Sequence, residues 1–417
     1  MSKPYLNGNK ILITTKRFPP EAPATAVLGK ELAEALGQQG YQVDVAAGYP
    51  HHPYGRIFPG YKKKWLSLEE AEGYRLFRGW HFIHSSPAML IRSLMMISQC
   101  GSYLPIALLT EKPAVVISFD GYPLIGQLTS TIVARMYKAK AVNVIYDIYP
   151  DIAVELGKLN NAFLIGIARK IENLIYSWSD KIVVLSEGFR RTLVEEKGVD
   201  PKKVAVIPVW LDAKDIFPLP RDNPWRREMG IPLEKFVILY AGTIGLVSGA
   251  EMIVEVAQSL APYQDIQFLL VGDGYGKELV RSRVQEKGLK NIRFLPFQPR
   301  DRLSELQATA DVSLVTLAPG RGRTSVPSKV LGYMAAARSV IASVDQDCDT
   351  ADMIREAKCG IVIPPGNPGA MVDAVLSYYD NPAKTRLCGE RGRTYFLKNF
   401  EKTVVIKKYY KLLQELI

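Results

Sequence analysis

The sequence predicts an α/β protein built from two doubly wound, parallel-sheet domains. Short apolar runs typical of buried strands alternate with amphipathic segments, and a chain of 417 residues is long enough for two full cores. A proline-punctuated stretch at 213–232 is the predicted linker. We therefore predict one domain at 1–212 and a second at 233–393. A charged amphipathic helix is predicted at 394–417.

The composition is that of an ordinary globular protein with a basic surface. The formal net charge is +11 and the pI is about 9.2, which suits nucleic acid, anionic lipid or phosphorylated substrates. We find no nucleic-acid-binding module, so the last two are favoured. Four scattered cysteines without a Cys-x-x-Cys pair argue against a zinc site and a disulfide scaffold. We expect no secretory signal.

The first predicted domain opens with a βαβ unit. Lys10 to Thr15 is a predicted strand, Thr25 to Gln39 an amphipathic helix closed by Gly40, and Tyr41 to Ala47 the next strand. Such a unit implies two parallel strands joined by a right-handed crossover.

A loop dense in proline, glycine and aromatic residues follows at 48–61, a composition typical of a functional loop. Its adjacent histidines have no third ligand nearby in the sequence, so we expect no metal there. The lysine run after it is either a solvated turn or a basic–aromatic patch for an anionic membrane surface. The residues predicted to face the acceptor or the membrane are Arg17, His51, His52, Tyr54, Lys62, Lys63, Lys64 and Trp65.

The stretch from Met89 to Leu109 is largely apolar, with Arg92 as its only charge and with Gly101 and Pro105 as interruptions. Its length is close to that of a membrane span. We interpret it instead as a helix of a soluble domain with an apolar surface that dips into the membrane interface. A plain core helix remains an alternative.

Asp147 is the carboxylate that we expect on the acceptor side. A predicted strand at 141–145 ends just before it, and open α/β sheets place ligand-binding groups where strands end. The alternative is a helix-capping aspartate. Asp151 is a second, weaker candidate.

The second domain repeats this pattern with glycine-rich turns. A strand beginning at Phe236 leads to Gly242 and Gly245, and a strand at 267–271 leads to Gly272. Small residues at such turns let backbone N–H groups approach an anion, although loop punctuation is the simpler reading.

A strand-loop-helix unit at 312–342 is the centre of the predicted site. A proline near the first turn and the cap candidates Ser325 and Ser328 predict a helix from about 328 to 337. The amides and positive dipole end of such a helix favour an anion, and Lys329 adds a full charge. An ordinary structural unit with solvated basic residues is the alternative. The run 345–349 has the acidic content of a divalent-metal site, but it suits turn chemistry better.

The chain resembles a known family. Pro327-Ser-Lys-x-x-x-Tyr-Met-Ala-Ala336 followed by Val340-Ile-Ala342 resembles the donor-site motif of family 4 glycosyltransferases of the GT-B fold. The likeness is greatest to the branch that makes capsule, colanic-acid and O-antigen polysaccharides, including fucosyl- and N-acetylfucosaminyl-transferases. Segments 146–157 and 209–212 resemble two further motifs of the family, so the likeness covers nearly the whole chain.

The resemblance implies two Rossmann-like domains facing across a cleft, with the C-terminal helix packed back on the first. It implies retaining, metal-independent transfer of a sugar from a UDP- or GDP-linked donor, with no cofactor. The basic N-terminal part and the apolar stretch at 89–109 indicate a lipid-linked saccharide as the acceptor. The protein would be cytoplasmic, on the inner face of the membrane. Asp147 and Lys329 are the expected catalytic residues. The expected nucleotide-sugar-binding residues are Gly242, Thr243, Gly245, Gly272, Asp273, Phe297, Gln298, Arg323, Ser325, Val326, Pro327, Ser328 and Tyr333.

The sequence also departs from the family's pattern. Two glutamates of the usual motif align with Thr324 and Gly332, and the usual first-loop glycines align with Pro23 and Ala24. A non-catalytic GT-B binding partner is therefore one alternative, and a nucleotide-sugar epimerase on the same fold is another. A nicotinamide dehydrogenase is disfavoured because no Gly-x-Gly-x-x-Gly follows the first strand.

Overall fold

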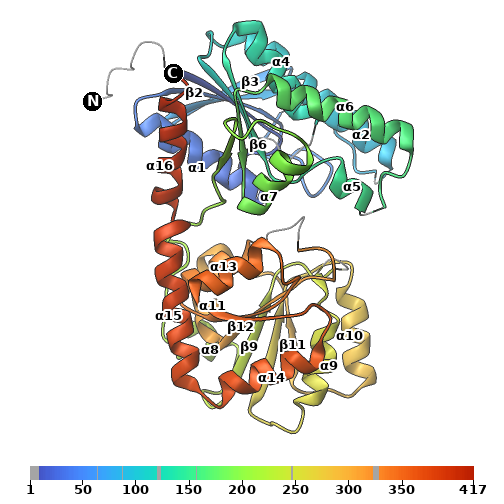
Figure 1. Cartoon of the computed structure of the whole chain (residues 1–417), viewed down its shortest axis with the longest axis vertical. Coiled ribbons are helices and arrows are strands. Elements are labelled where there is room, and N and C mark those ends of the chain that lie inside the picture. Colours follow the sequence, from blue (N-terminus) through green and yellow to red (C-terminus); the bar gives the residue numbers. More distant parts are fainter. Residues whose placement is uncertain are drawn as a thin grey trace. The chain divides into compact units, whose positions relative to one another are not determined.

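The computed structural model describes residues 9–62, 64–86, 88–119, 124–155, 157–245, 248–322 and 328–417. The chain divides into two compact units (Figure 1). Met1–Pro208 and Ile406–Ile417 form the first unit, and Val209–Val405 form the second. Each unit is a largely parallel sheet with helices packed on it, which confirms the predicted fold class.

The sheet of the first unit has eight strands in the order β3-β4-β2-β1-β5-β6-β7-β8. All neighbours are parallel except β3 and β4, which form an antiparallel hairpin at one edge. In the centre, Ile11 pairs with Val43 on one side and with Val115 on the other. The strands are β1 (Lys10–Thr15), β2 (Gln42–Gly48), β3 (Leu66–Ala71), β4 (Tyr74–Gly79), β5 (Val115–Ser118), β6 (Lys140–Ile145), β7 (Lys181–Val184) and β8 (Val204–Val206).

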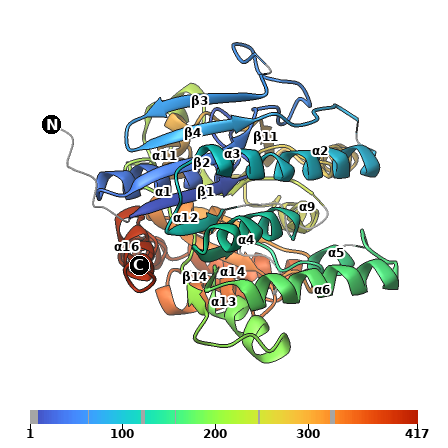
Figure 2. The same cartoon turned by 90° about the horizontal axis from the view of Figure 1, so that it is seen from above.

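The helices of the first unit pack on this sheet, α1 against β1, β2 and β4, and α4 against β5 and β6. Figure 2 shows α4 between the α2–α3 pair and α6, and α4 contacts all three helices. The helices are α1 (Ala24–Gln38), α2 (Met89–Gly101), α3 (Tyr103–Leu109), α4 (Ile125–Tyr137), α5 (Asp151–Glu155), α6 (Ala162–Trp178), α7 (Glu187–Arg191) and η1 (Thr192–Glu196).

The apolar stretch at 89–109 forms two helices, because the helix is interrupted at Ser102, between α2 and α3. Within the described ranges, no helix has both the length and the apolar composition that crossing a membrane requires.

The sheet of the second unit has six parallel strands in the order β11-β10-β9-β12-β13-β14. Alternate residues of β9 face opposite sides of the sheet. Val237 and Leu239 pack in one hydrophobic core, and Ile238 and Tyr240 pack in the other. Both faces of the sheet are therefore covered, as the near-continuous apolar strands require. The strands are β9 (Phe236–Ala241), β10 (Ile266–Val271), β11 (Ile292–Leu295), β12 (Val312–Thr316), β13 (Ser339–Ser343) and β14 (Gly360–Ile363).

The helices of the second unit follow its strands on both faces. They are α8 (Pro224–Glu228), α9 (Met252–Ser259), α10 (Lys277–Glu286), η3 (Arg300–Arg302), α11 (Leu303–Thr309), α12 (Lys329–Ala335), α13 (Asp349–Ala357), α14 (Pro368–Tyr379), α15 (Pro382–Asn399) and α16 (Lys402–Gln414), the last of which continues into the first unit.

Two expected boundaries differ from the structure. The stretch 213–232 is part of the second unit, because Ile216, Trp225 and Ile231 are buried in its core. The C-terminal stretch 394–417 is not one helix, since α15 ends at Asn399 and α16 begins at Lys402. Residues from Ile406 onward group with the first unit, where Tyr410 Oη donates to the carbonyl of Ala35 at 2.8 Å.

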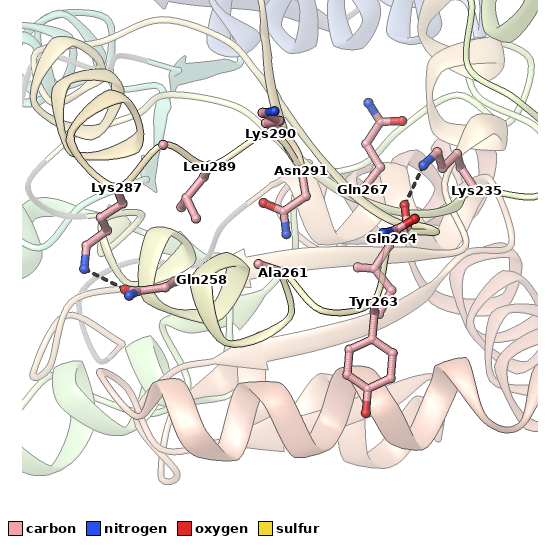
Figure 3. A pocket seen from close by; sticks show the side chains of 12 residues that line it. Lys235, Gln258, Ala261, Tyr263, Gln264, Gln267, Lys287, Leu289, Lys290 and Asn291 are labelled. Carbon is pink, nitrogen blue, oxygen red and sulfur yellow. Dashed lines mark hydrogen bonds between the residues drawn. The ribbon is translucent and has the colours of Figure 1, made fainter.

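Two pockets lie at the amino-terminal ends of the strands in the second unit. One has a volume of about 780 Å³ and includes residues that begin β9 and β13. The other has a volume of about 570 Å³ and is lined by lysines and carboxamides (Figure 3). Figure 3 shows Lys287 directed toward Gln258 and Lys235 toward Gln264, and in both cases the ammonium group donates a hydrogen bond.

Candidate active site

The second unit has a topological switch point between β9 and β12, which are neighbours in the sheet. The loop after β9 leads to α9, whose Ile253 packs in one core, whereas the loop after β12 leads to α12, whose Val330 packs in the other. Chains that leave neighbouring strands toward opposite faces open a crevice at the carboxyl ends, where α/β sheets bind ligands. Gly242, Thr243 and Lys329 therefore lie near the position where this fold places a ligand.

Lys329 and Gly242 meet at this switch point. The ammonium group of Lys329, the first residue of α12, lies 3.9 Å from the ring centre of Tyr240. A Cβ atom added at Gly242 would lie 3.1 Å from Lys329 Nζ and 3.2 Å from its Cε. The cation–π contact holds the charge in place, and Gly242 leaves the space that the lysine fills. The structure thus brings together two residues that the sequence placed 87 positions apart.

The glycine turns do not offer the free amides that the sequence predicted. In each turn the amide already has a partner, so these N–H groups do not wait for a phosphate. The amide of Gly242 donates to Val271 O (2.9 Å), that of Gly245 to Ser248 Oγ (3.0 Å) and that of Gly272 to Leu295 O (3.0 Å). Among the residues that the structure describes, Lys329 is therefore the group that brings positive charge to Gly242.

The glycines instead let neighbouring loops interlock. A Cβ atom at Gly272, where φ is +146°, would lie 1.9 Å from the carbonyl oxygen of Gly242. At Gly274, where φ is +150°, it would lie 2.2 Å from the carbonyl oxygen of Ile244. Backbone this close excludes any side chain, so both positions require glycine. Asp273 between them is exposed, and its carboxylate accepts from the Gly274 amide at 2.8 Å.

Tyr333 is a positioning residue rather than a ligand contact. Its ring is fully buried and its hydroxyl accepts a hydrogen bond from the amide of Ala241 at 3.0 Å. Burial raises the pKa of the phenol, so it stays protonated. The bond ties α12 to the end of β9, the two elements that carry Lys329 and Gly242.

We expect Tyr333→Phe to lower the free energy of unfolding by about 1–3 kcal/mol, because it leaves the buried Ala241 amide without its partner. Urea denaturation measures this loss. Tyr395→Phe, which removes a hydrogen bond to Glu356 on the surface, is the matched control with a smaller expected effect. Equal losses in the two variants would contradict a stabilising role for the hydrogen bond between Tyr333 and Ala241.

At the end of β11, Phe297 and Gln298 have different surroundings. The ring of Phe297 is 58 % exposed. Gln298 is used within the fold, because its Oε1 accepts from the indole of the buried Trp225 at 3.0 Å and its Nε2 donates to Pro296. Of these two side chains, that of Phe297 is therefore the more accessible to a ligand. Thr243, the residue after Gly242, is exposed. Its carbonyl oxygen accepts a hydrogen bond from Tyr240 Oη at 2.7 Å.

Gly332 packs against a neighbouring helix. A Cβ atom there would lie 3.1 Å from Gln307 Nε2 on α11 and 3.4 Å from Ile216 Cδ1. The family's usual glutamate at this position would require Gln307 to move. The absence of the carboxylate thus coincides with close packing of Gln307 against Gly332, which the sequence analysis did not predict.

The acidic run at 345–349 has a structural use. The two carboxylate oxygens of Asp345 accept from the amides of Gly320 and Gly322, at 3.0 and 2.8 Å. This clamp shapes the turn that precedes Arg323. In the part of the chain that the structure describes, no group of three or more histidine, cysteine or acidic side chains is arranged to hold a metal ion.

Several predicted residues lie outside the described residues: Lys63, Arg323, Thr324, Ser325, Val326 and Pro327. Of the two cap candidates, Ser325 is among these residues, and Ser328 has helical backbone angles and a hydroxyl that caps no described amide. The helix is also shorter than predicted, running only from Lys329 to Ala335.

In the first unit the predicted acceptor residues follow the carboxyl ends of parallel strands. Arg17 follows β1, His51 follows β2, and Asp147 follows β6. In the order β2-β1-β5-β6 these ends share one edge of the sheet, within about 15 Å for three strand spacings. Asp147 is exposed, yet desolvation by the surrounding protein raises the pKa of its carboxyl. Asp151 is engaged in an ion pair with Lys197 at 2.6 Å, which gives it a structural use.

The histidines of the loop are part of a buried cluster. The Nδ1 atom of His51 lies 3.4 Å from Nε2 of His81, which is completely buried. The buried carboxylate of Glu21 accepts from the amides of His51 and His52, at 3.2 and 2.8 Å. Sequence reasoning missed His81 and Glu21, which lie 30 residues from His51 on either side in the chain.

We expect this cluster to make stability depend on pH. Burial, followed by the charges of Arg17 and Lys16, lowers the pKa of His52 to about 4, and burial lowers that of His51. Unfolded histidines take up protons near pH 6.5, so the unfolded state binds more protons between about pH 6.5 and 4, and stability falls as the pH drops through this window. Urea denaturation at several pH values should show a shallower fall for His52→Gln. His84→Gln is the control, and equal slopes in all three proteins would refute the assignment.

The basic–aromatic segment lies at the surface. Trp65 is 74 % exposed, and its ring stacks on Trp80 with centres 5.5 Å apart. Lys62 and Lys64 are exposed beside it, and Tyr54 is exposed on the preceding loop. These residues are available to a partner outside the fold.

Two family models match successive parts of the chain. The model of the glycosyl transferase 4-like domain matches residues 25–210, and that of the glycosyl transferases group 1 matches residues 222–395. Each covers one unit, and the second includes the switch-point residues described above. Fold and site thus define a GT-B glycosyltransferase. The chain belongs to family 4 of these enzymes, as its motifs indicated.

Relatives with similar sequences are described as glycosyltransferases, one of them in colanic acid biosynthesis. The glycosyltransferase WbjE of Pseudomonas aeruginosa is 28% identical over 276 residues, which is 65% of this chain and 67% of that protein. A protein of Escherichia coli K12 described as the colanic acid biosynthesis glycosyl transferase WcaI is 26% identical over 343 residues, 81% of this chain and 83% of the other. They confirm the resemblance to that branch.

Solved structures share the fold. The sucrose-phosphate synthase of Thermosynechococcus elongatus has a TM-score of 0.74 at 16% identity, covering 98% of this chain and 99% of that one. HepE of Anabaena, solved in complex with UDP, has a TM-score of 0.73 at 14% identity, covering 97% and 100%. At these identities the likeness establishes the GT-B fold alone.

Proposed function

We propose that the protein transfers a sugar from a UDP- or GDP-linked donor to a lipid-linked saccharide in surface polysaccharide synthesis, with retention at the anomeric carbon. The observation that carries this proposal is the placement of Lys329 beside Gly242 at the switch point of the second unit. The relatives WbjE and WcaI support the polysaccharide context. HepE, solved with UDP, supports a uridine nucleotide as the first donor to test.

Lys329 would bind the diphosphate and neutralise it as it leaves. Negative charge grows on the leaving diphosphate in the transition state, so a fixed cation there stabilises the transition state more than the ground state. The Tyr240 ring contacts the ammonium group, and Tyr333 ties α12 to the end of β9, so both would hold Lys329 in place before the donor arrives. The exposed ring of Phe297 offers a surface for the base.

Asp147 would contact the acceptor saccharide. It follows a strand end of the first unit, and a carboxylate accepts hydrogen bonds from sugar hydroxyl groups. Arg17 and the loop that carries His52 lie on the same sheet edge and would contribute to acceptor recognition.

We propose no bound metal or cofactor for this reaction, because Lys329 supplies the charge that a divalent ion supplies to a diphosphate elsewhere. The test is a thermal-shift panel of UDP, GDP, ADP and their common sugars, with and without EDTA. Stabilisation by UDP or GDP that EDTA leaves unchanged is the expected result. Stabilisation that requires a divalent ion would overturn the metal-independent mechanism.

We further propose that the first unit binds the inner face of the cell membrane. Leu90, Leu94 and Ile97 recur at helical spacing on α2 and are 71 %, 46 % and 52 % exposed. Phe163 and Leu164 on α6 are 75 % and 49 % exposed. Both helices contact α4, so their apolar residues belong to one helical layer. Such a surface would bring the protein to the membrane that holds a lipid-linked acceptor.

Vesicle flotation tests this surface. We expect the protein to float with phosphatidylglycerol vesicles, and a Leu90→Glu/Phe163→Glu variant to bind at least about tenfold more weakly, because each side chain contributes roughly 1.5–3 kcal/mol on burial. Leu279→Glu in the second unit, where the leucine is 44 % exposed, is the matched control. Equal flotation of both variants would exclude α2 and α6 as the contact.

A non-catalytic GT-B partner is the second candidate function, because Gln307 packs where the family's glutamate would lie. The two candidates differ in turnover. A protein that binds the nucleotide but releases no UDP or GDP in the presence of membrane-derived acceptor lipids would favour the partner role.

A further inference from the structure

The larger pocket of the second unit is lined by four arginines, and we call it the arginine pocket. It lies at the amino-terminal edge of the sheet, where Phe236 begins β9 and Ser339 begins β13. The switch point lies at the other end of these strands, about 20 Å away for a six-residue strand. With a volume of about 780 Å³, it is large enough for a small organic molecule. The arginines are Arg221, Arg338, Arg386 and Arg393.

The walls of the pocket are fixed by close backbone packing. A Cβ atom at Gly389 of α15 would lie 2.2 Å from the carbonyl oxygen of Ala337, whose φ is +56°. At Gly392 it would lie 2.9 Å from Cys359 Cβ. These contacts press α15, which carries Arg386 and Arg393, onto the turn that carries Arg338. The arginines therefore project from a rigid frame.

The fold neutralises only part of this charge. Asp311 is committed to Arg221, through Nε at 2.9 Å and Nη2 at 3.0 Å, and it also accepts from the amide of Val237. The only other carboxylate among the lining residues is the exposed Glu390. Four guanidinium groups against two carboxylates leave an excess of two positive charges.

The remaining guanidinium groups have capacity to bind a ligand. Arg338 donates to the carbonyls of Ala310 and Leu219, and Arg393 to those of Ile216 and Ala335, but neither has a carboxylate partner among the described residues. Desolvation lowers the pKa of Arg338 to about 10, and the charge of Asp311, which is shared with Arg221, offsets this only in part. Arg386 is exposed on α15.

We propose that the arginine pocket binds a small phosphate-bearing molecule at a site separate from the donor site. A phosphate monoester carries a charge of about −1.5 to −2 at pH 7, which matches the excess of two positive charges. Planar guanidinium groups bind phosphate oxygens in pairs, so arginine rather than lysine is the expected residue. The hydroxyls of Thr385 and Thr394 and the ring of Phe236 line the rest of the pocket.

The neighbouring pocket of Figure 3 has a weaker case. Its Lys287 and Lys290 are exposed, and Lys287 already donates to Gln258 at 2.6 Å. Solvated lysines keep their hydration and their charges are screened by salt. In the arginine pocket Arg221, Arg338 and Arg393 are half-buried and do not have that alternative.

The test is isothermal titration of the full chain with inorganic pyrophosphate and with glycerol 3-phosphate. Because the donor site also binds phosphates under the proposed function, the titrations use the Lys329→Ala protein. We expect binding to persist there, and to weaken by about tenfold or more on adding Arg386→Gln, since hydrogen bonds to charged groups contribute at least this much. Arg391→Gln, an exposed arginine of the same helix outside the pocket, is the matched control and should change nothing.

A second variant protects the test against misfolding. Thr394→Glu places a carboxylate at the pocket rim without removing a buried cation, and it should abolish binding of both probes. If the unmodified protein binds the probes and the Lys329→Ala protein does not, the phosphate binds at the donor site and the proposal is overturned. Equal binding with and without Arg386→Gln, tighter binding of citrate than of either phosphate, or no binding at millimolar concentration would also overturn it. None of these outcomes depends on sugar transfer.

Discussion

Lys329→Ala is expected to slow sugar transfer by about 10²–10³-fold, the loss typical of removing one fixed group that stabilises developing charge. The lysine is half-buried at the surface of α12, and its ammonium group contacts the Tyr240 ring. Losing that contact costs about 0.5–2 kcal/mol of stability, so the melting temperature should fall by only a few degrees. The measurements are a steady-state rate with membrane-derived acceptor and a thermal melt of the same preparation.

Lys398→Ala is the matched control, because Lys398 is an exposed lysine of α15 in the same unit. It should change neither rate nor melting temperature. An unchanged rate in Lys329→Ala would remove the lysine from the mechanism. A rate loss that follows the loss of folded protein would instead make it a structural residue.

Gly272→Ala is expected to have the largest effect on stability. Its Cβ atom would lie 1.9 Å from the carbonyl oxygen of Gly242, so one of the two loops must move, and φ of +146° is strained for alanine. Strain and overpacking together predict a loss of roughly 2–6 kcal/mol in the free energy of unfolding. Nucleotide binding should fall with it, because the displaced loop is the one that faces Lys329.

Gly288→Ala separates the two causes of this loss. At Gly288 φ is +60°, but no atom lies within 4 Å of the added Cβ, so only backbone strain of about 1–2 kcal/mol is expected. Urea denaturation compares the two variants directly. If Gly272→Ala is no less stable than Gly288→Ala, the loops do not interlock as described.

The sequence predicted the parallel core of both units well, because buried strands leave a local apolar signal. The bounds of β1 match the predicted strand, and β6 and β10 each begin one residue before the strands predicted at 141–145 and 267–271. The hairpin of β3 and β4 was not predicted, because β3 is a largely exposed edge strand of charged and small residues that lacks an apolar run.

The site was predicted only in part, because its geometry depends on contacts between distant segments. Local pattern indicated an anion at each of Gly242 and Lys329, the family resemblance placed both in one site, and the structure brings them together. It could not show that the turn amides are bonded to neighbouring loops, nor that Gln307 packs where a glutamate was expected. The cluster of His51, His81 and Glu21 is also formed by tertiary packing alone.

Hydrogen exchange with and without nucleotide tests the central claim, that the donor binds at the switch point of the second unit. The full chain is compared alone and with saturating UDP or GDP, and peptides are followed by mass spectrometry. We predict slower exchange in the peptides that cover 241–245 and 328–333, with smaller changes at 296–298. Protection confined to the first unit, or to the peptides around the arginine pocket, would contradict this account.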